Sequence, residues 1–258
     1  MQSRFGSEPE WLAPESLDDA LRLNAEREDV TVVAGGTFVG ILVNQRLLFP
    51  SAFLSLARVP GLAYVEAGDE LRLGAMTTHR AVELSALVRE RWPALAAAFS
   101  VVASPRVRNQ ATVGGVLADA DYASDPPSML LALGARAVAR SVRGEREIPV
   151  EELIVEVRVP GGAHRAAYRK FRTRSHEDRP CVGVAACRRG AELRVAVGAV
   201  ADRPQYFPEL CDPAAPAAEV ARAYASAIDP LSDFAGSSDY RRRVIAVEVR
   251  RALEELAA

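Results

Sequence analysis

The sequence predicts a mixed α+β fold whose sheets are largely antiparallel, and two observations carry this prediction. Apolar residues recur at helical spacing near both ends of the chain, over residues 14–28 and 238–257. Between them lie short apolar segments separated by brief turns, which is the pattern of strands that pair with their sequence neighbours. No segment is repeated, so the sequence does not indicate a solenoid or a propeller.

The N-terminal residues, 1–57, are expected to form a small lobe of helix and sheet. A helix that begins near Pro14, with acidic residues in its first turn, is predicted to run toward Glu28. A strand, a glycine pair and a short helix are then expected in this order, at 30–34, 35–36 and 41–43.

The next residues, 58–162, are expected to form a second lobe that combines short strands with helices. Strands are predicted at 62–65, 71–75, 135–141, 145–149 and 153–159. Helices are predicted at 81–84, 92–102 and 128–133. Thr77 or Thr78 is the expected N-cap of the first helix, and Asp125, ahead of two prolines, marks the start of the last one. A Pro-Gly-Gly turn at 160–162 is the expected boundary.

The remaining residues, 163–258, are expected to form a C-terminal domain. Strands are predicted at 166–172, 182–187 and 193–200, and helices at 216–227 and 238–257. Arginines and glutamates alternate along the last helix, which favours a solvated or subunit-facing surface over a nucleic-acid site.

The composition is that of an ordinary soluble protein. The 258 residues carry a net charge of −2 and a pI of about 6.0, which gives no electrostatic reason to expect nucleic acid or an anionic membrane as a partner. The N-terminus lacks the apolar core of a signal peptide, and no apolar run approaches the length of a membrane span. We therefore expect a cytoplasmic protein with no membrane span.

The cysteines and histidines do not form a metal or nucleophile motif. Cys181, Cys187 and Cys211 lack Cys-x-x-Cys spacing, and the histidines are far apart in the sequence, so no metal is expected and any iron–sulfur centre must lie in a partner. His79 is interpreted as a turn or helix-start residue. Ser124 lacks the Gly-x-Ser-x-Gly context of hydrolases, and no catalytic residue is assigned.

Two glycine pairs are the strongest indication of a binding site. Gly35-Gly36 follows an apolar β-branched run, and Gly114-Gly115 precedes a short acidic segment that ends at Asp125. Glycine permits positive φ and close approach, so each pair is expected to turn backbone N–H groups toward a bound anion. Two such loops can hold one pyrophosphate, and neither matches the Rossmann or P-loop pattern.

Four different short motifs follow one another along the chain: Ala34-Gly35-Gly36-Thr37, Leu73-Gly74-Ala75-Met76-Thr77-Thr78-His79, Arg108-Asn109-Gln110-Ala111-Thr112-Val113-Gly114-Gly115 and Ala123-Ser124-Asp125. In this order they resemble the medium, FAD-binding subunit of the molybdenum hydroxylases, the xanthine dehydrogenase and carbon monoxide dehydrogenase flavoprotein family. Matches at 152–154, 170–171 and 236–242 extend the resemblance over nearly the whole chain. It implies the two-lobed FAD-binding fold of the vanillyl-alcohol oxidase (PCMH) type, with a small C-terminal α+β domain.

The resemblance implies FAD as cofactor and a role in electron transfer. In such complexes a small subunit with two 2Fe-2S clusters delivers electrons to the flavin, and a large molybdopterin subunit hydroxylates the substrate. The flavin passes the electrons to NAD, oxygen or a quinone, and this outer-sphere step needs no protein acid or base. Two alternatives stay open: a scaffold that has lost FAD, and a stand-alone FAD-dependent reductase that resembles the enolpyruvyl reductases of cell-wall synthesis.

The resemblance also implies a set of cofactor-binding residues. They are Val33, Ala34, Gly35, Gly36, Thr37, Phe38, Ala103, Thr112, Gly114, Gly115, Asp125, Leu153, Ile154 and Lys170. The two glycine loops are expected to bind the pyrophosphate through backbone N–H groups, with hydroxyl contacts from the two threonines. Phe38 and Val116 stand where many family members have Asp and Asn, which leaves the tightness of FAD binding open.

Four of these residues have two interpretations each. Asp125 matches an aspartate that accepts a hydrogen bond from a ribose hydroxyl, or it is a helix N-cap, and it can serve as both. Leu153 and Ile154 match an apolar platform under the flavin ring, or they belong to a plain core strand. Lys170 matches a lysine near the polar edge of the ring, or it is a solvated strand residue.

Overall fold

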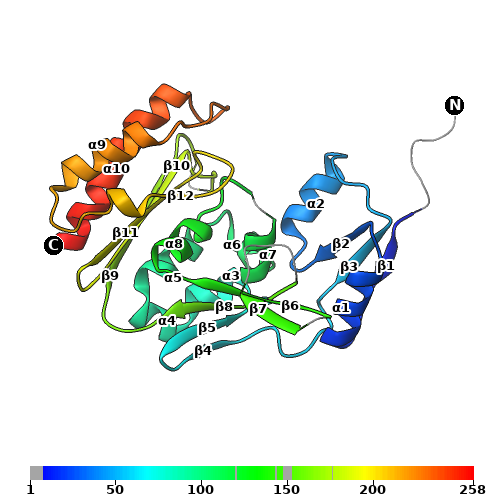
Figure 1. The fold of residues 1–258 in the computed structure, drawn as a ribbon. Coiled ribbons are helices and arrows are strands. Elements are labelled where there is room, and N and C mark those ends of the chain that lie inside the picture. The colour runs from blue at the N-terminus through cyan, green and yellow to red at the C-terminus, as the bar shows by residue number, and fades with distance from the viewer. Residues whose placement is uncertain (1–7, 120, 143, 148–152, 176) are drawn as a thin grey trace, which may run out of the picture.

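The computed structural model describes residues 8–119, 121–142, 144–147, 153–175 and 177–258. Over these residues the chain forms three sheets, which follow one another along the sequence and across the molecule (Figure 1). The N-terminal sheet lies at the right of the view and the C-terminal sheet at the left, where two long helices cover it. The mixed α+β class predicted from the sequence is confirmed.

The N-terminal sheet is parallel. Its strands are β1 (Glu10–Leu12), β2 (Val30–Val33) and β3 (Ala52–Ser55), in the order β1-β3-β2. Helices α1 (Leu17–Glu26) and α2 (Thr37–Asn44) connect them, and such crossover connections make neighbouring strands parallel. The helices and β2 agree with the small lobe of helix and sheet predicted here, whereas β1 and β3 were not predicted.

The middle sheet is antiparallel. Its order is β4-β5-β8-β6-β7, and the strands span Val65–Ala67, Glu70–Gly74, Leu153–Pro160, Arg136–Ser141 and Gly144–Glu147. The strand predicted at 62–65 begins only at Val65, because Leu62 is a buried core residue whose carbonyl accepts a hydrogen bond from Met76. Residues 148 and 149 of another predicted strand lie outside the described residues.

Six helices lie between β5 and β6 in the sequence. They are α3 (His79–Leu84), α4 (Ala86–Arg91), α5 (Pro93–Ser100), α6 (Pro105–Arg108), α7 (Val113–Ala118) and α8 (Pro126–Ala132). Thr78 caps α3, because its hydroxyl accepts a hydrogen bond from the amide of Ala81 at 3.1 Å. The second glycine pair lies inside the first turn of α7 rather than in a loop, which corrects the prediction.

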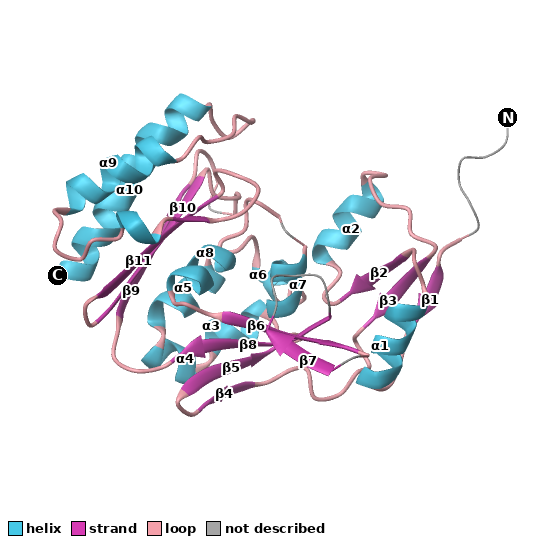
Figure 2. Ribbon diagram, in the orientation of Figure 1, coloured by secondary structure: helices cyan, strands magenta, loops and turns pink. Residues whose placement is uncertain are grey.

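The C-terminal sheet is antiparallel and is covered on both faces. Its order is β12-β11-β10-β9, and the strands span Gln205–Tyr206, Glu192–Gly198, Val182–Arg189 and Arg165–Phe171. A short 3-10 helix, η1 (Pro208–Leu210), follows β12. Helices α9 (Ala217–Ala227) and α10 (Ser238–Ala257) cover one face, while α5 and α8 lie between the other face and the middle sheet (Figure 2).

The alternation of side chains along β10 assigns its two faces to two hydrophobic cores. Ala185 and Cys187 pack into the core that also contains Phe99 and residues of the middle sheet. Val184 and Ala186 pack into the core beneath α9 and α10. Because successive side chains of a strand point to opposite faces, this near-continuous apolar strand is buried on both sides.

Candidate cofactor site

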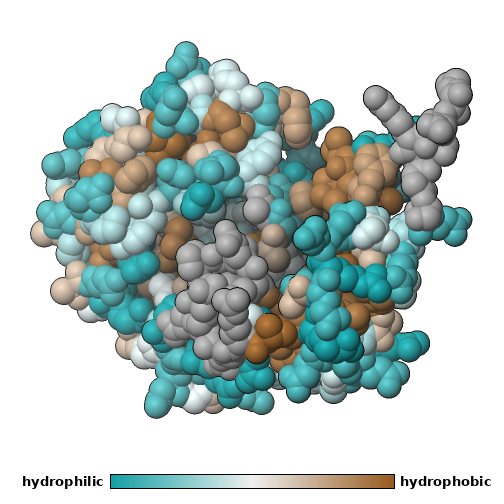
Figure 3. Space-filling view, turned by 45° about the vertical axis from the view of Figure 1, so that its right-hand side comes forward, coloured by the Kyte–Doolittle hydropathy of each residue, from teal (hydrophilic) through white to brown (hydrophobic). Residues whose placement is uncertain are grey.

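A cleft of about 570 Å³ separates the N-terminal sheet and α2 from the rest of the molecule. Segments far apart in the sequence line it: the start of α2, the wall formed by 102–103, the start of α7, the 123–125 loop, the start of β8 and Lys170. All of the predicted site residues line the cleft except Val33, which is buried at the end of β2. Apolar surface gathers over α2 on the N-terminal lobe (Figure 3).

The first glycine pair leads directly into helix α2. Gly36 has a φ of +70° and is the N-cap, and the first backbone bond of the helix runs from the amide of Gly40 to the carbonyl of Gly36. The amides of the first turn precede that bond and have no acceptor within the helix. They lie at the positive end of the helix dipole, beside the cleft that Thr37 and Phe38 line. This end of α2 is suited to a phosphate.

The second glycine pair is not an open donor site. The amide of Gly114 donates to the carbonyl of Ala75 at 2.8 Å, and that of Gly115 donates to the hydroxyl of Thr112 at 3.1 Å. The amide of Val113 donates to the carbonyl of Thr77 at 2.9 Å. The expectation that this pair turns free N–H groups toward an anion is therefore wrong, because α7 begins against the end of β5 and uses them there.

Close packing explains why glycine is needed at position 114. A Cβ built there lies 2.7 Å from the Cβ of Ala75, so a side chain would push α7 away from β5. At Gly115 a Cβ would lie 2.8 Å from the hydroxyl oxygen of Thr112, which is the capping atom. The glycines thus bring α7 to the wall of the cleft.

Asp125 and Lys170 form a buried ion pair at the cleft. The carboxylate accepts hydrogen bonds from the hydroxyl of Tyr168 at 2.7 Å and from Nζ of Lys170 at 2.9 Å. Lys170 also donates to the carbonyl of Val101 at 2.8 Å. Burial raises the pKa of Asp125 and lowers that of Lys170, while the attraction between the two charges opposes both shifts.

This pair decides two of the alternatives left open by the sequence. Asp125 occupies the N-cap position of α8, as predicted, but its side chain makes no capping hydrogen bond and binds Tyr168 and Lys170 instead. The side chain of Lys170 is 3% exposed, so it is not a solvated strand lysine. Leu153 and Ile154 are core residues and also line the cleft, so the two interpretations of these residues do not exclude each other.

His79 and Asp119 also line the cleft and were not predicted as site residues. Nε2 of His79 donates to the carbonyl of Thr112 at 3.2 Å, and Nδ1 has no partner among the described residues. Burial lowers the pKa of His79 to about 4. Burial also raises the pKa of Asp119 to about 6. Only the threonine–threonine–histidine motif itself signals His79, because nothing in the sequence shows that it becomes buried.

The described residues contain no group of three potential metal ligands among His, Cys, Asp and Glu side chains. Cys181, Cys187 and Cys211 are all buried with free thiols. Among the helices of the described chain, none combines the length and the apolar character needed to cross a membrane.

Comparison with known proteins places the chain in a family. Residues 3–163 match the family described as the FAD binding domain in molybdopterin dehydrogenase. The chain is 34% identical to the 6-hydroxypseudooxynicotine dehydrogenase complex subunit alpha of Paenarthrobacter nicotinovorans, covering 95% of this chain and 93% of that protein. It is 29% identical to the carbon monoxide dehydrogenase medium chain of Hydrogenophaga pseudoflava, covering 95% of each.

The solved structures agree. A carbon monoxide dehydrogenase structure from Hydrogenophaga pseudoflava superimposes with a TM-score of 0.91 at 27% identity, covering 97% of this chain and 98% of that one. Quinoline 2-oxidoreductase from Pseudomonas putida 86 gives a TM-score of 0.88 at 27% identity, with 97% of both chains covered. The fold is that of these flavoprotein subunits. The chain belongs to the medium, FAD-binding subunits of the molybdenum hydroxylases, and it is an oxidoreductase subunit with FAD as cofactor.

The residues of the cleft fit FAD. A dinucleotide needs donors for its phosphates, which the first turn of α2 offers, and acceptors for its hydroxyls, which the buried and unpaired Nδ1 of His79 and the carboxylate of Asp125 can supply. The remaining lining is mainly apolar, as expected for a site that buries a flavin.

Proposed function

We propose that this chain carries electrons, through its bound FAD, from the 2Fe-2S clusters of a small partner subunit to NAD, oxygen or a quinone. A large molybdopterin subunit of the same complex would oxidise the substrate. The observation that carries the proposal is a cleft suited to FAD in a chain whose described residues offer no metal-ligand cluster.

Several observations support the proposed partners. The flavin supplies chemistry that accepts electrons singly and releases them singly or in pairs. The thiols of this chain are separately buried, so clusters that feed the cofactor belong in another subunit. The relatives are named as subunits of larger enzymes, among them the nicotine 6-hydroxylase medium subunit of Paenarthrobacter nicotinovorans.

Each cleft residue is assigned a binding rather than a catalytic role. The first turn of α2, from Thr37, binds the pyrophosphate, and Asp125 accepts a hydrogen bond from a ribose hydroxyl. Leu153 and Ile154 form an apolar platform for the flavin. Lys170 fixes the carboxylate of Asp125 through a hydrogen bond and ion pair. No acid or base in the cleft has to exchange a proton for electrons to pass.

We also propose that the three sheets correspond to three units, 1–57, 58–162 and 163–258. The sheets themselves support these limits, since no described strand pairs with a strand from another unit.

Anaerobic reconstitution tests the proposal. The chain is mixed with its small iron–sulfur and large molybdopterin subunits, and flavin absorbance is followed after substrate is added. We expect bleaching of the oxidised flavin only when all three subunits are present. Bleaching by the substrate with this chain alone would favour a stand-alone reductase. A purified chain that stays colourless and takes up no added FAD would favour a scaffold.

A further inference from the structure

The wall of the cleft contains a backbone segment in an unusual conformation. Val102 and Ala103 line the cleft, and Ala103 has a φ of +38°. Residues with a Cβ avoid this left-handed region, so the surrounding structure must hold Ala103 there.

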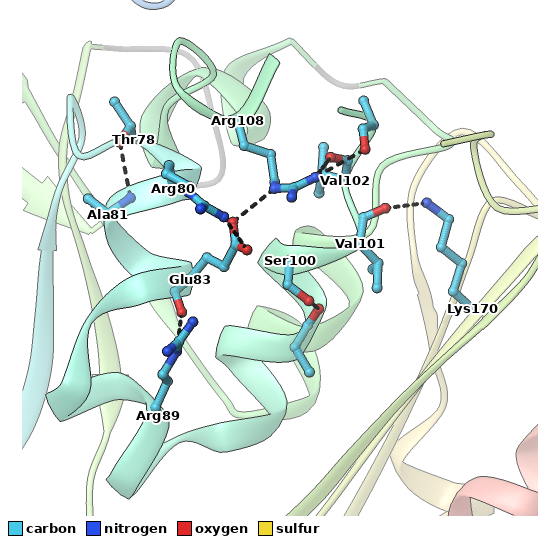
Figure 4. A network of polar contacts seen from close by, with 12 residues as sticks. Thr78, Arg80, Ala81, Glu83, Arg89, Ser100, Val101, Val102, Arg108 and Lys170 are labelled. Atoms are coloured by element: carbon cyan, nitrogen blue, oxygen red, sulfur yellow. Dashed lines mark hydrogen bonds and ion pairs between the residues drawn. The ribbon is translucent and has the colours of Figure 1, made fainter. Parts of the chain in front are cut away.

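Two cations hold the three carbonyl groups of this segment. Nζ of Lys170 donates to the carbonyl of Val101 at 2.8 Å. Nη1 of Arg108 donates to the carbonyls of Val102 and Ala103, at 2.8 and 3.0 Å (Figure 4). The carbonyl oxygens of Val102 and Ala103 are thereby turned toward Arg108, which does not line the cleft.

Arg108 is itself held by a carboxylate. Its Nε donates to Oε2 of Glu83 at 2.9 Å, and both side chains are about nine-tenths buried. Arg80 donates to the other carboxylate oxygen at 2.6 Å, and Nε of Arg89 donates to the backbone carbonyl of Glu83 at 2.7 Å (Figure 4). Burial alone would raise the pKa of Glu83, but the hydrogen bonds from Arg80 and Arg108 outweigh burial and lower it. The carboxylate therefore stays charged and fixes the guanidinium of Arg108.

The planar peptide bond carries this restraint to the other side of the segment. In a trans peptide the N–H points opposite to the preceding carbonyl, so the amides of Ala103 and Ser104 point away from Arg108. The described residues supply no acceptor for either amide. Val102 and Ala103 line the cleft and Arg108 does not. From this we infer that the two N–H groups, which point away from Arg108, face the cleft. Successive N–H groups beside a left-handed residue form a concave donor site for an oxygen atom.

We propose that Arg108, fixed by Glu83, is a positioning residue that presents the amides of Ala103 and Ser104 to an oxygen acceptor of bound FAD. The inference deepens the FAD-binding role on which the proposed function rests. It does not depend on the partner subunits or on the electron acceptor.

Two substitutions, each of an arginine that binds the carboxylate of Glu83, test the proposal. Arg108→Gln removes the cation that turns the two carbonyls. Arg80→Gln removes the more exposed partner of Glu83, which contacts no carbonyl of the segment, and leaves the buried Arg108 in place to keep the carboxylate charged. FAD affinity of the apo-protein is measured by quenching of flavin fluorescence. We expect Arg108→Gln to weaken FAD binding about 10- to 100-fold, the effect of losing two hydrogen bonds, and Arg80→Gln to stay within about twofold of wild type.

Two further readouts separate positioning from general stability. The midpoint potential of the bound flavin should become more negative in Arg108→Gln if the acceptor is a ring carbonyl. If the acceptor is in the pyrophosphate half, ADP affinity should fall instead and the potential should stay the same. Either shift supports the proposal. Unchanged affinity for FAD and ADP with an unchanged potential overturns it, and so does an equal loss of affinity in Arg80→Gln.

Arg108→Lys covers the case in which Arg108→Gln does not fold. Lysine keeps the charge opposite Glu83 but lacks the planar fork that reaches a carboxylate and two carbonyls together. We expect FAD binding weakened about 3- to 10-fold with near-wild-type thermal stability, the effect of one lost hydrogen bond. Wild-type FAD affinity in Arg108→Lys would overturn the proposal. A failure of substrate-dependent flavin reduction with normal FAD binding would concern the proposed function alone.

Discussion

The carbonyl oxygen of Gln110 lies 1.9 Å from the point where a Cβ at Gly35 would have to sit. The loop that begins α2 and the segment that leads into α7 therefore touch at a backbone-to-backbone contact. Glycine is required at this position by the protein itself, before any cofactor binds. The contact joins the two motifs that the sequence singled out, and Gly35 itself lines the cleft.

Gly35→Ala is expected to force these two segments apart. A methyl group cannot be accommodated against backbone, so we expect destabilisation of about 1–3 kcal/mol, comparable to overpacking in a core, together with weakened FAD binding. Thermal melting and FAD titration measure the two effects. Gly40→Ala, in the helix that follows, is the control, because a Cβ there meets no atom within 4 Å. Alanine at that position should stabilise slightly. Equal behaviour of the two variants would contradict the contact.

The buried pair of Asp125 and Lys170 predicts a non-additive double-mutant cycle. Asp125→Asn leaves the ammonium of Lys170 without its counter-charge, which should cost the apo-protein about 3–5 kcal/mol. An N-cap alone would account for about 1 kcal/mol. In Asp125→Asn with Lys170→Met, part of the loss should return, because no buried charge is left unpaired. Additive losses in urea unfolding of the two single variants and the double variant would argue against a coupled pair.

His79 predicts a loss of stability in mild acid. Its pKa is lowered by burial to about 4, while in the unfolded chain it takes its ordinary value near 6.5. Above pH 6.5 His79 is neutral in both the folded and the unfolded state, so the free energy of unfolding is not reduced by its titration. As the pH falls from 6.5 to 4 the unfolded state binds the proton first, so the free energy of unfolding drops by roughly 3 kcal/mol.

Unfolding of the apo-protein in urea between pH 7.5 and 4 measures this drop. His79→Gln should be less stable at neutral pH but should show a shallower decline over this window. A variant whose decline runs parallel to that of wild type would assign the acid sensitivity to other groups.

For Asp119 we expect the opposite pH dependence of the free energy of unfolding. Burial raises its pKa to about 6, with a further contribution from the charge of Asp121 and an opposing one from Arg179. Its stabilising, protonated form is present below about pH 4 and is lost as the pH rises through 6. Asp119→Asn keeps the oxygen that accepts from the amide of Asp121, and it cannot ionise.

The Asn variant should therefore exceed wild type above pH 6 by roughly 2 kcal/mol, after allowance for solvent screening of a partly buried group, and should match it near pH 4. Melting temperatures at pH 4, 6 and 8 check this. A gain that is the same at all three values would show that ionisation of Asp119 is not its cause.

Local signals in the sequence predicted most of the regular structure. The acidic first turn of α1, the threonine before α3 and the apolar spacing of α10 act within one helix, so they can be recognised without knowing the fold. Strands β1 and β3 escaped prediction because they are three and four residues long and are defined by pairing with each other and with β2. A segment this short is too brief to show the alternation of apolar and polar residues by which a strand is recognised.

The candidate site was likewise predictable only as far as local sequence signals reach. The motifs indicated which segments meet at the cleft, since each is short and continuous in sequence. The atoms that each residue contacts depend on distant partners: Asp125 is bound by Tyr168, 43 residues away, and Arg108 by Glu83, 25 residues away. The helical start at Gly114 was equally hidden, because a glycine pair favours a loop, whereas packing against Ala75 and the cap from Thr112 stabilise the helix there.

The C-terminal sheet has a consequence for how the protein can be divided. The match to FAD-binding domains ends at residue 163, yet both groups that hold Asp125 come from β9, beyond that point. A fragment cut there would keep the glycine motifs but expose a lone carboxylate and the apolar side of α5 and α8 to water. The boundary near residue 163 therefore separates two sheets but not two independent folding units, because Asp125 on one side depends on Tyr168 and Lys170 on the other.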